Sequence, residues 1–213
     1  MVGWFTRTGI VIQAHTSVLR KKRSEEYFRA TERALAMMKE QAKVGEIELR
    51  YGDESGFSCL PSIQGAWAPL GETHQADASV GRKRANVIGV LDYAKGSLDY
   101  RLFEHSIKRP QVVEFIDGLA KKSDPERLTV LVMDNAKVHH NFGEEVVNRW
   151  LVDHRFVVMY LPAYSPELNL IEIVWKHAKH FWRSFKSWGK DKLVEEVHAL
   201  LSGFGSKFKI SYA

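Results

Sequence analysis

The chain has 213 residues, enough for one domain with a substantial hydrophobic core, and its net charge of +5 favours a polyanionic partner without establishing one. The single cysteine, Cys59, excludes an intramolecular disulfide and a cysteine-based zinc site, which fits a reducing compartment. The chain contains neither a secretory leader nor an apolar run of about 18 residues, so we expect a cytoplasmic protein that makes no contact with membranes.

The N-terminal part divides into a basic arm and a helix. The first 23 residues show no sustained periodicity and end in a basic cluster at residues 20–23, whereas residues 24–43 are rich in helix formers with apolar residues on one face. The arm could follow a DNA backbone, although basic clusters that flank a helix are more often simply solvated.

Strand signals follow the helix. Alternating apolar residues predict a strand over residues 46–51, which runs into a polar, glycine-containing segment that carries Asp53. Residues 85–105 contain two strand-like runs joined at residues 94–97 by a composition typical of turns, so we predict an antiparallel hairpin.

Helices and strands then alternate to the end of the chain. The predicted elements are a helix at 110–121, a strand at 128–133 that ends at Asp134, a helix at 143–154, a buried strand at 156–161, a loop at 163–166, a helix from Glu167 onward that contains Glu172, and an amphipathic helix at about 189–201. This order predicts an α/β fold, in which a mixed sheet is covered by helices on both faces in a ribonuclease-H-like layout.

Three carboxylates stand out by their positions: Asp53 after the first strand, Asp134 after a central buried strand, and Glu172 early in a later helix. A carboxylate beside a buried apolar strand needs a compensating charge, and a divalent cation is the strongest local one. Oxygen ligands favour magnesium or manganese, and two such ions can activate a water or a DNA 3′ hydroxyl for displacement at phosphorus. A lone acid of this kind is more often a helix cap or a solvated loop residue, so the prediction rests on the set.

Three segments resemble the signature blocks of mariner-like insertion-sequence transposases, which belong to the DDE superfamily. They are YGDESGF at residues 51–57, MDNA at 133–136 together with His139, and LPAYSPELNLIE at 161–172. Their order and spacing also agree with the family, and residues 65–72 resemble the tryptophan turn that these enzymes carry between the first two blocks.

The resemblance implies a ribonuclease-H-like catalytic domain that holds two magnesium or manganese ions through Asp53, Asp134 and Glu172. It also implies hydrolytic nicking of transposon ends, strand transfer into target DNA, double-stranded DNA as partner, a homodimer that pairs two ends, and a place at the bacterial nucleoid. We accordingly divide the chain into an arm and linker helix at 1–44, a DDE catalytic domain at 45–205 and a tail at 206–213.

Two further acids lie near the predicted ligands. Glu54 follows Asp53 on the strand and should face the other way, so we interpret it as a non-ligand. Glu167 lies five residues before Glu172 and is the fallback ligand.

Asn135 and His139 have two open interpretations. They either orient the Asp134 carboxylate or contact DNA, or they simply cap and hydrogen-bond locally. A transition-metal pair of His139 and His140 is disfavoured, because consecutive side chains point apart on most backbones.

Basic residues beside the hairpin and on the C-terminal helices are candidate phosphate contacts. They are Arg82, Lys83, Arg84, Lys176 and Lys179, and further along Arg183, Lys186, Lys190 and Lys192 with Trp182 and Trp188 interleaved. A basic helix face is more often solvated, and such tryptophans are more often part of the core.

The chain departs from the family pattern in two respects. Family members usually carry a proline where Leu170 stands, and often a second where Ala163 stands, so we expect a less rigid loop before Glu172. They also begin with helix-turn-helix modules that the residues before the first block are too few to hold, so we expect a truncated copy, a separately encoded catalytic half or an excerpt. Two alternatives stay open: a ribonuclease-H-like nuclease without strand transfer, and an inactive DNA-binding or dimerisation remnant.

Overall fold

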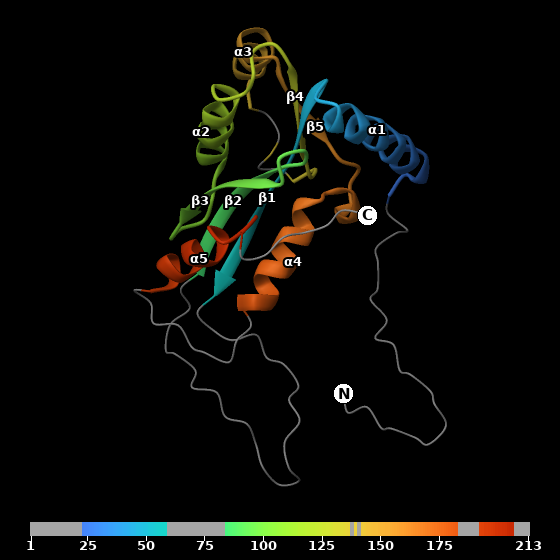
Figure 1. Ribbon diagram of the computed structural model, residues 1–213. Helices are drawn as coiled ribbons and strands as arrows, with labels where there is room; N and C mark the ends of the chain where they lie inside the picture. Colours follow the sequence, from blue (N-terminus) through green and yellow to red (C-terminus); the bar gives the residue numbers. More distant parts are fainter. Residues whose placement is uncertain (1–22, 59–83, 137–138, 140–141, 183–191, 207–213) are drawn as a thin grey trace, which may run out of the picture.

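A five-stranded mixed sheet forms the centre of the molecule (Figure 1), in a computed structural model that describes residues 23–58, 84–136, 139, 142–182 and 192–206. The strands are β1 (Ile47–Ser58), β2 (Arg84–Asp92), β3 (Ser97–Phe103), β4 (Leu128–Met133) and β5 (Phe156–Tyr160). The helices are α1 (Glu25–Lys43), α2 (Arg109–Ala120), α3 (Glu144–His154), α4 (Ile171–Trp182) and α5 (Leu193–Leu201). A short 3-10 helix, η3 (Pro166–Leu168), precedes α4.

The sheet has the order β3-β2-β1-β4-β5. The two pairings among β1, β2 and β3 are antiparallel, and β4 pairs in parallel with both β1 and β5. β4 accompanies only the first half of β1, since the register runs from Ile47↔Leu128 to Gly52↔Met133. The second half of β1 is paired with β2 alone among the described residues.

Each face of the sheet has its own hydrophobic core, because successive strand residues point to opposite faces. Leu49 and Tyr51 of β1 pack in the core under α1, α4 and α5. Leu131 and Met133 of β4 pack in the other core, under α2 and α3. The predicted mixed sheet with helices on both faces is therefore confirmed.

The helix ends follow the sequence signals. The Ser24 hydroxyl caps α1 by accepting from the Tyr27 backbone N–H at 3.3 Å, and acidic residues occupy the first turn, where the helix dipole favours negative charge. Pro110 lies in the first turn of α2, where its missing N–H costs nothing.

Three element predictions need correction. β1 does not end before Asp53 but continues to Ser58, because β2 supplies antiparallel partners for the polar, glycine-containing stretch. β5 is an edge strand and mostly half-buried, so the prediction of a fully buried strand was wrong. The third block is not helical throughout from Glu167, since η3 ends at Leu168, Asn169 is extended and α4 begins at Ile171.

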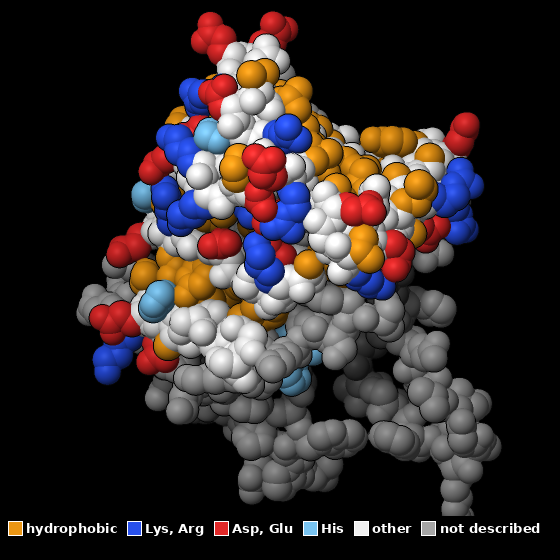
Figure 2. Space-filling view, turned by 45° about the horizontal axis from the view of Figure 1, so that its top comes forward, with side chains coloured by type: hydrophobic (Ala, Val, Ile, Leu, Met, Phe, Trp, Pro, Cys, Tyr) orange, Lys and Arg blue, Asp and Glu red, His pale blue; other side chains and the backbone are white. Residues whose placement is uncertain are grey.

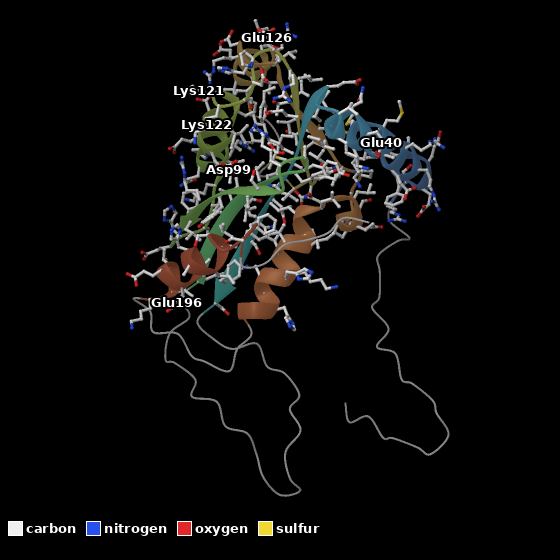
Figure 3. The ribbon with its side chains drawn as sticks, viewed as in Figure 1. Glu40, Asp99, Lys121, Lys122, Glu126 and Glu196 are labelled. Atoms are coloured by element: carbon white, nitrogen blue, oxygen red, sulfur yellow. The ribbon has the colours of Figure 1, made fainter. Side chains whose placement is uncertain are left out.

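Charged and hydrophobic side chains share the surface of the described fold that Figure 2 shows. On the face shown in Figure 2, acidic and basic side chains are intermixed, so the net positive charge is not concentrated there. Glu40 of α1, Lys121 and Lys122 just after α2, and Glu196 of α5 extend outward (Figure 3). Within the described residues, no helix combines the length and apolar character needed to cross a membrane.

Several sequence predictions fall outside the described residues. They concern the N-terminal arm up to residue 22, Cys59, the segment at 65–72, Arg82 and Lys83, His140, the basic residues and Trp188 between α4 and α5, and the tail from residue 207. Of Trp182, at the end of α4, only the backbone is described.

Candidate active site

Asp53 and Asp134 lie side by side on neighbouring parallel strands. The register of β1 and β4 closes with Gly52↔Met133, and each aspartate is the next residue of its chain. Asp53 is only 9% exposed and lies within β1, whereas the Asp134 side chain is 48% exposed just beyond the end of β4. The two carboxylates are therefore neighbours at the point where β4 stops and β1 continues.

Helix α4 brings Glu172 to the same place. Gly89, the β2 partner of Asp53, allows the Trp175 ring to pack closely, since a Cβ at Gly89 would lie 2.7 Å from Trp175 Cη2. Glu172 is exposed in the first turn of this helix, one turn before Trp175. α4 thus packs against the sheet beside Asp53 and carries Glu172 on its first turn.

Asn169 ties the segment before α4 to the Asp53 strand. Its Nδ2 donates to the Gly52 carbonyl oxygen at 3.1 Å, and the side chain is only 2% exposed. No role was predicted for Asn169 from the sequence, although a polar residue in a block that otherwise leads into an apolar helix face was a usable signal.

The three carboxylates interact electrostatically. Burial raises the pKa of Asp53 to about 8, together with the negative charges of Glu172, Asp134 and Glu54. Burial also raises the pKa of Glu172, to which the charge of Asp134 adds while Lys179 opposes it. In the part of the chain that the structure describes, no three acidic, histidine or cysteine side chains stand in a closed metal-binding arrangement. The acids are therefore neighbours, but their oxygens do not converge as they stand.

His139 links Asp134 to Glu54. Its Nδ1 lies 2.6 Å from Asp134 Oδ1 and its Nε2 lies 2.6 Å from Glu54 Oε2. Burial lowers the pKa of this fully buried histidine, but the hydrogen bonds to both carboxylates outweigh burial and raise it to about 10. The Tyr160 hydroxyl holds the same residue by donating to the His139 carbonyl oxygen. Glu54 faces away from Asp53, as the alternation predicted.

A cavity of about 420 Å³ opens beside these acids. Asp134, Asn135 and Glu172 line it together with the loop from Leu161 to Pro166. Tyr164 in this loop is exposed and has a left-handed backbone with φ of 59°, which is uncommon for a residue other than glycine. The cavity brings the second and third sequence blocks together around a space of nucleotide size.

The other candidate residues from the sequence differ in their contacts and in their position relative to the three acids. Glu167, the fallback ligand, pairs with Arg23 instead. Lys176 and Lys179 follow Glu172 by four and seven residues and so share its helix face. The Arg84 guanidinium lies across Gly56 on β1, where a Cβ would be 1.9 Å from Arg84 Nε.

Comparisons with known proteins agree with this architecture. Residues 48–194 match the family model described as DDE superfamily endonuclease. A crystal structure of the Mos1 mariner paired end complex with Mn superposes with a TM-score of 0.67 at 15% identity, covering 95% of this chain and 61% of that chain. The Mos1 strand transfer complex gives a TM-score of 0.60 at 14% identity, covering 95% of this chain and 68% of that chain.

A search of curated proteins finds no match. Identities of 14% and 15% show a common fold and no more, and the chain spans 61% of the first Mos1 chain. The family match covers most of the chain, including all three sequence blocks. The chain therefore belongs to the DDE superfamily endonucleases and has their ribonuclease-H-like fold.

Proposed function

We propose that residues 45–205 form the catalytic domain of a DNA transposase, which hydrolyses phosphodiester bonds at transposon ends and transfers the freed 3′ ends into target DNA. Asp53, Asp134 and Glu172 would hold the divalent cations of this reaction. The observation that carries the proposal is the buried Asp53 carboxylate, whose pKa is raised to about 8 by burial and by neighbouring acids, two of which, Asp134 and Glu172, line a cavity.

The residues fit a divalent cation. Three carboxylates that repel one another are stabilised when a cation is bound between them, and an all-oxygen donor set favours Mg²⁺ or Mn²⁺. Glu172 is exposed on the first turn of α4 and interacts electrostatically with both aspartates. When bound, two such ions would activate the attacking water or 3′ hydroxyl and stabilise the departing oxygen.

The chain's own residues set the geometry. β1 fixes Asp53 within a five-stranded sheet, and Asn169 fastens the segment that leads to Glu172 onto the same strand. Lys176 and Lys179, on the Glu172 face of α4, are suited to attract the phosphates of a DNA strand toward the cavity.

The partners follow by analogy with the solved Mos1 complexes. These are a paired end complex with Mn and a strand transfer complex. We propose that this chain likewise acts on double-stranded DNA, pairs two ends as a homodimer, uses two Mg²⁺ or Mn²⁺ ions, and works at the bacterial nucleoid. One site can serve both the hydrolytic step and the strand-transfer step, because the two steps differ only in the attacking nucleophile, a water or a DNA 3′ hydroxyl.

The test is metal-dependent cleavage of supercoiled plasmid and of labelled duplexes taken from the DNA that flanks the gene. Asp134→Asn and Glu172→Gln should reduce cleavage in Mg²⁺ or Mn²⁺ to background. Glu167→Gln is the matched control, because that exposed acid lies in the same segment and pairs with Arg23. A duplex with a free 3′ hydroxyl separates the products, since joining to a second DNA shows a transposase and hydrolysis alone shows a nuclease. Cleavage that survives both substitutions would contradict the proposal.

A further inference from the structure

We propose that Glu54 is a positioning residue that fixes the Asp134 carboxylate through His139, from the opposite face of the sheet. The consequence for metal binding rests on the proposed function, whereas the chain of contacts itself does not.

The contacts form one continuous chain. Glu54 Oε2 lies 2.6 Å from His139 Nε2, and Asp134 Oδ1 lies 2.6 Å from His139 Nδ1. Both nitrogens of one imidazole are therefore engaged by carboxylate oxygens, so the ring cannot turn without losing a contact. His139 is fully buried, and Glu54 keeps 21% of its side chain exposed.

The sheet explains why Glu54 can reach this ring. Neighbouring strand residues point to opposite faces, so Glu54 points away from the side on which Asp53 meets Glu172. β4 ends at Met133, beside Gly52, and leaves the next residues of β1 without a strand on that side among the described residues. His139 lies in that gap and contacts Glu54 across 85 residues of sequence.

Asp134 needs such support more than Asp53 does. It follows the last residue of β4, its side chain is 48% exposed, and the neighbouring backbone is irregular. Its Oδ1 accepts from the Ala136 backbone N–H at 3.1 Å and from His139. Hydrogen bonds of this kind fix the orientation of metal-binding groups, and removing one typically costs about 10- to 100-fold in metal affinity or activity.

The position of Glu54 is unfavourable for its second carboxylate oxygen. Its second oxygen, Oε1, is buried and has no hydrogen-bond partner among the described residues. A buried acceptor without a partner is unfavourable, so a glutamate at this place is better explained by its bond to His139 than by its own stability.

The direct test is NMR of the His139 ring in the full-length chain, with its signals assigned by His139→Ala. In the wild type, both ring N–H protons should be hydrogen-bonded and slow to exchange with water. Glu54→Leu should broaden or shift the Asp134-facing Nδ1–H signal, because the ring loses its second anchor. Glu54→Gln should preserve that signal, since its amide oxygen still accepts. An Nδ1–H signal that is unchanged in Glu54→Leu would overturn the proposal.

The second test is the affinity for Mn²⁺ alone, measured by calorimetry. Glu54→Leu should weaken it by about 10- to 100-fold, whereas Glu54→Gln should retain most of it. In a His139→Ala background, Glu54→Leu should add almost no further loss, because Glu54 acts through His139. If Glu54→Leu loses as much Mn²⁺ affinity in the His139→Ala background as in the wild type, the proposal is overturned. If Glu54→Gln loses as much affinity as Glu54→Leu, Glu54 is instead identified as a ligand.

The two tests separate this inference from the proposed function. A wild-type chain that binds no Mn²⁺ would contradict the proposed metal site, while the His139 signals would still decide whether Glu54 holds the ring. Glu167→Leu is the control for both measurements, since it removes an acid that pairs with Arg23. Thermal unfolding of each variant verifies that the measured chain is folded.

Discussion

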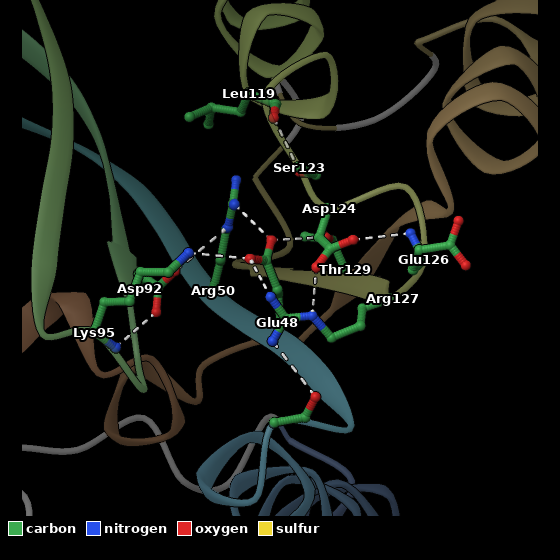
Figure 4. Close-up of polar contacts among 11 residues, drawn as sticks. Glu48, Arg50, Asp92, Lys95, Leu119, Ser123, Asp124, Glu126, Arg127 and Thr129 are labelled. Carbon is green, nitrogen blue, oxygen red and sulfur yellow. Dashed lines mark hydrogen bonds and ion pairs between the residues drawn. The ribbon is translucent and has the colours of Figure 1, made fainter.

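Strand β1 buries one acid near its start, Glu48, and another at its middle, Asp53, and the two have opposite surroundings. Glu48, 6% exposed, lies among cations, with Arg50 at 2.7 Å and Lys95 at 3.0 Å (Figure 4). Burial raises the pKa of Glu48, but Lys95, Arg50 and the Thr129 hydroxyl lower it below its usual range. Asp53, 9% exposed, lies among other acids, and its pKa is about 8.

This contrast separates an acid that supports the fold from one that is poised for a ligand. A buried carboxylate is stable when a cation and hydrogen bonds compensate its charge, as at Glu48. Where the neighbours are also anions, the compensation has to come from outside the chain. Both acids belong to the same strand, and they differ in the side chains that surround them.

The largest effect on stability is expected at Glu48, whose charge is compensated by neighbouring cations. Glu48→Gln should destabilise the protein by about 3–5 kcal/mol, because it leaves the 6% exposed Arg50 without its main anionic partner. Urea unfolding measures this free energy. Glu46→Gln, an exposed acid two residues earlier, is the control. A change below about 1 kcal/mol would show that the cluster adds little to stability.

Metal should stabilise the protein through the site around Asp53. At 100 times its Kd, Mn²⁺ should add about 2.7 kcal/mol to the free energy of unfolding of the wild type, seen as a rise in Tm. Asp134→Asn should lose this rise. The apparent affinity should increase as pH rises toward 8, because the cation competes with the proton on Asp53. An equal rise in Tm for both proteins would place the ion elsewhere.

A third acid, Asp117 on α2, resembles Glu48 because cations and hydrogen-bond donors compensate its charge. Hydrogen bonds from Lys121, Arg149 and Trp150 lower its pKa to about 2, against the effect of burial. Because this pKa is depressed, the stabilisation is present above pH ~4 and is lost as pH falls toward 2. Asp117→Asn should therefore cost about 1–2 kcal/mol at pH 7 and almost nothing near pH 2.

Chemical unfolding of wild type and Asp117→Asn across this range measures the difference. Asp153→Asn, an exposed acid of α3, serves as the control. A difference that stays constant with pH would show that Asp117 does not act through its charge.

The smallest effect is expected at Asn169. Asn169→Ala removes the bond from Nδ2 to the Gly52 carbonyl and should cost about 1 kcal/mol in unfolding free energy. Cleavage should fall more than stability does, since this contact fastens the segment before Glu172 to β1. Comparing urea midpoints with cleavage rates tests this, and a rate that follows the stability alone would reduce Asn169 to a structural role.

Local signals predicted most of the elements. The aliphatic run of β4 and the turn between β2 and β3 fixed their positions, because each depends on a few neighbouring residues. The extent of β1 was beyond such signals, since the polar stretch from Asp53 to Ser58 is a strand only where β2 pairs with it. The half-exposure of β5 likewise depends on its place at the edge of the sheet.

The candidate ligands could be proposed from the sequence because each lies in a recognisable block. The contacts that position their neighbourhood could not be predicted. His139 was a candidate to orient Asp134, but its bond to Glu54 spans 85 residues. The bond from Asn169 to Gly52 spans 117 residues. No periodicity or spacing reports contacts over such separations, because they depend on how the strands are ordered in the sheet.

The most direct measurement is the unfolding free energy of Asp53→Asn against wild type in EDTA, from pH 4 to pH 9. A carboxyl whose pKa is raised by folding opposes folding increasingly as pH rises from about 4 to 8, because the unfolded chain ionises first. The substitution should therefore make the metal-free protein more stable at pH 8 by about 1 kcal/mol or more, with little effect at pH 4, while cleavage falls to background. A variant that is destabilised at pH 8, or that still cleaves DNA, would contradict the account of Asp53 as an uncompensated metal ligand.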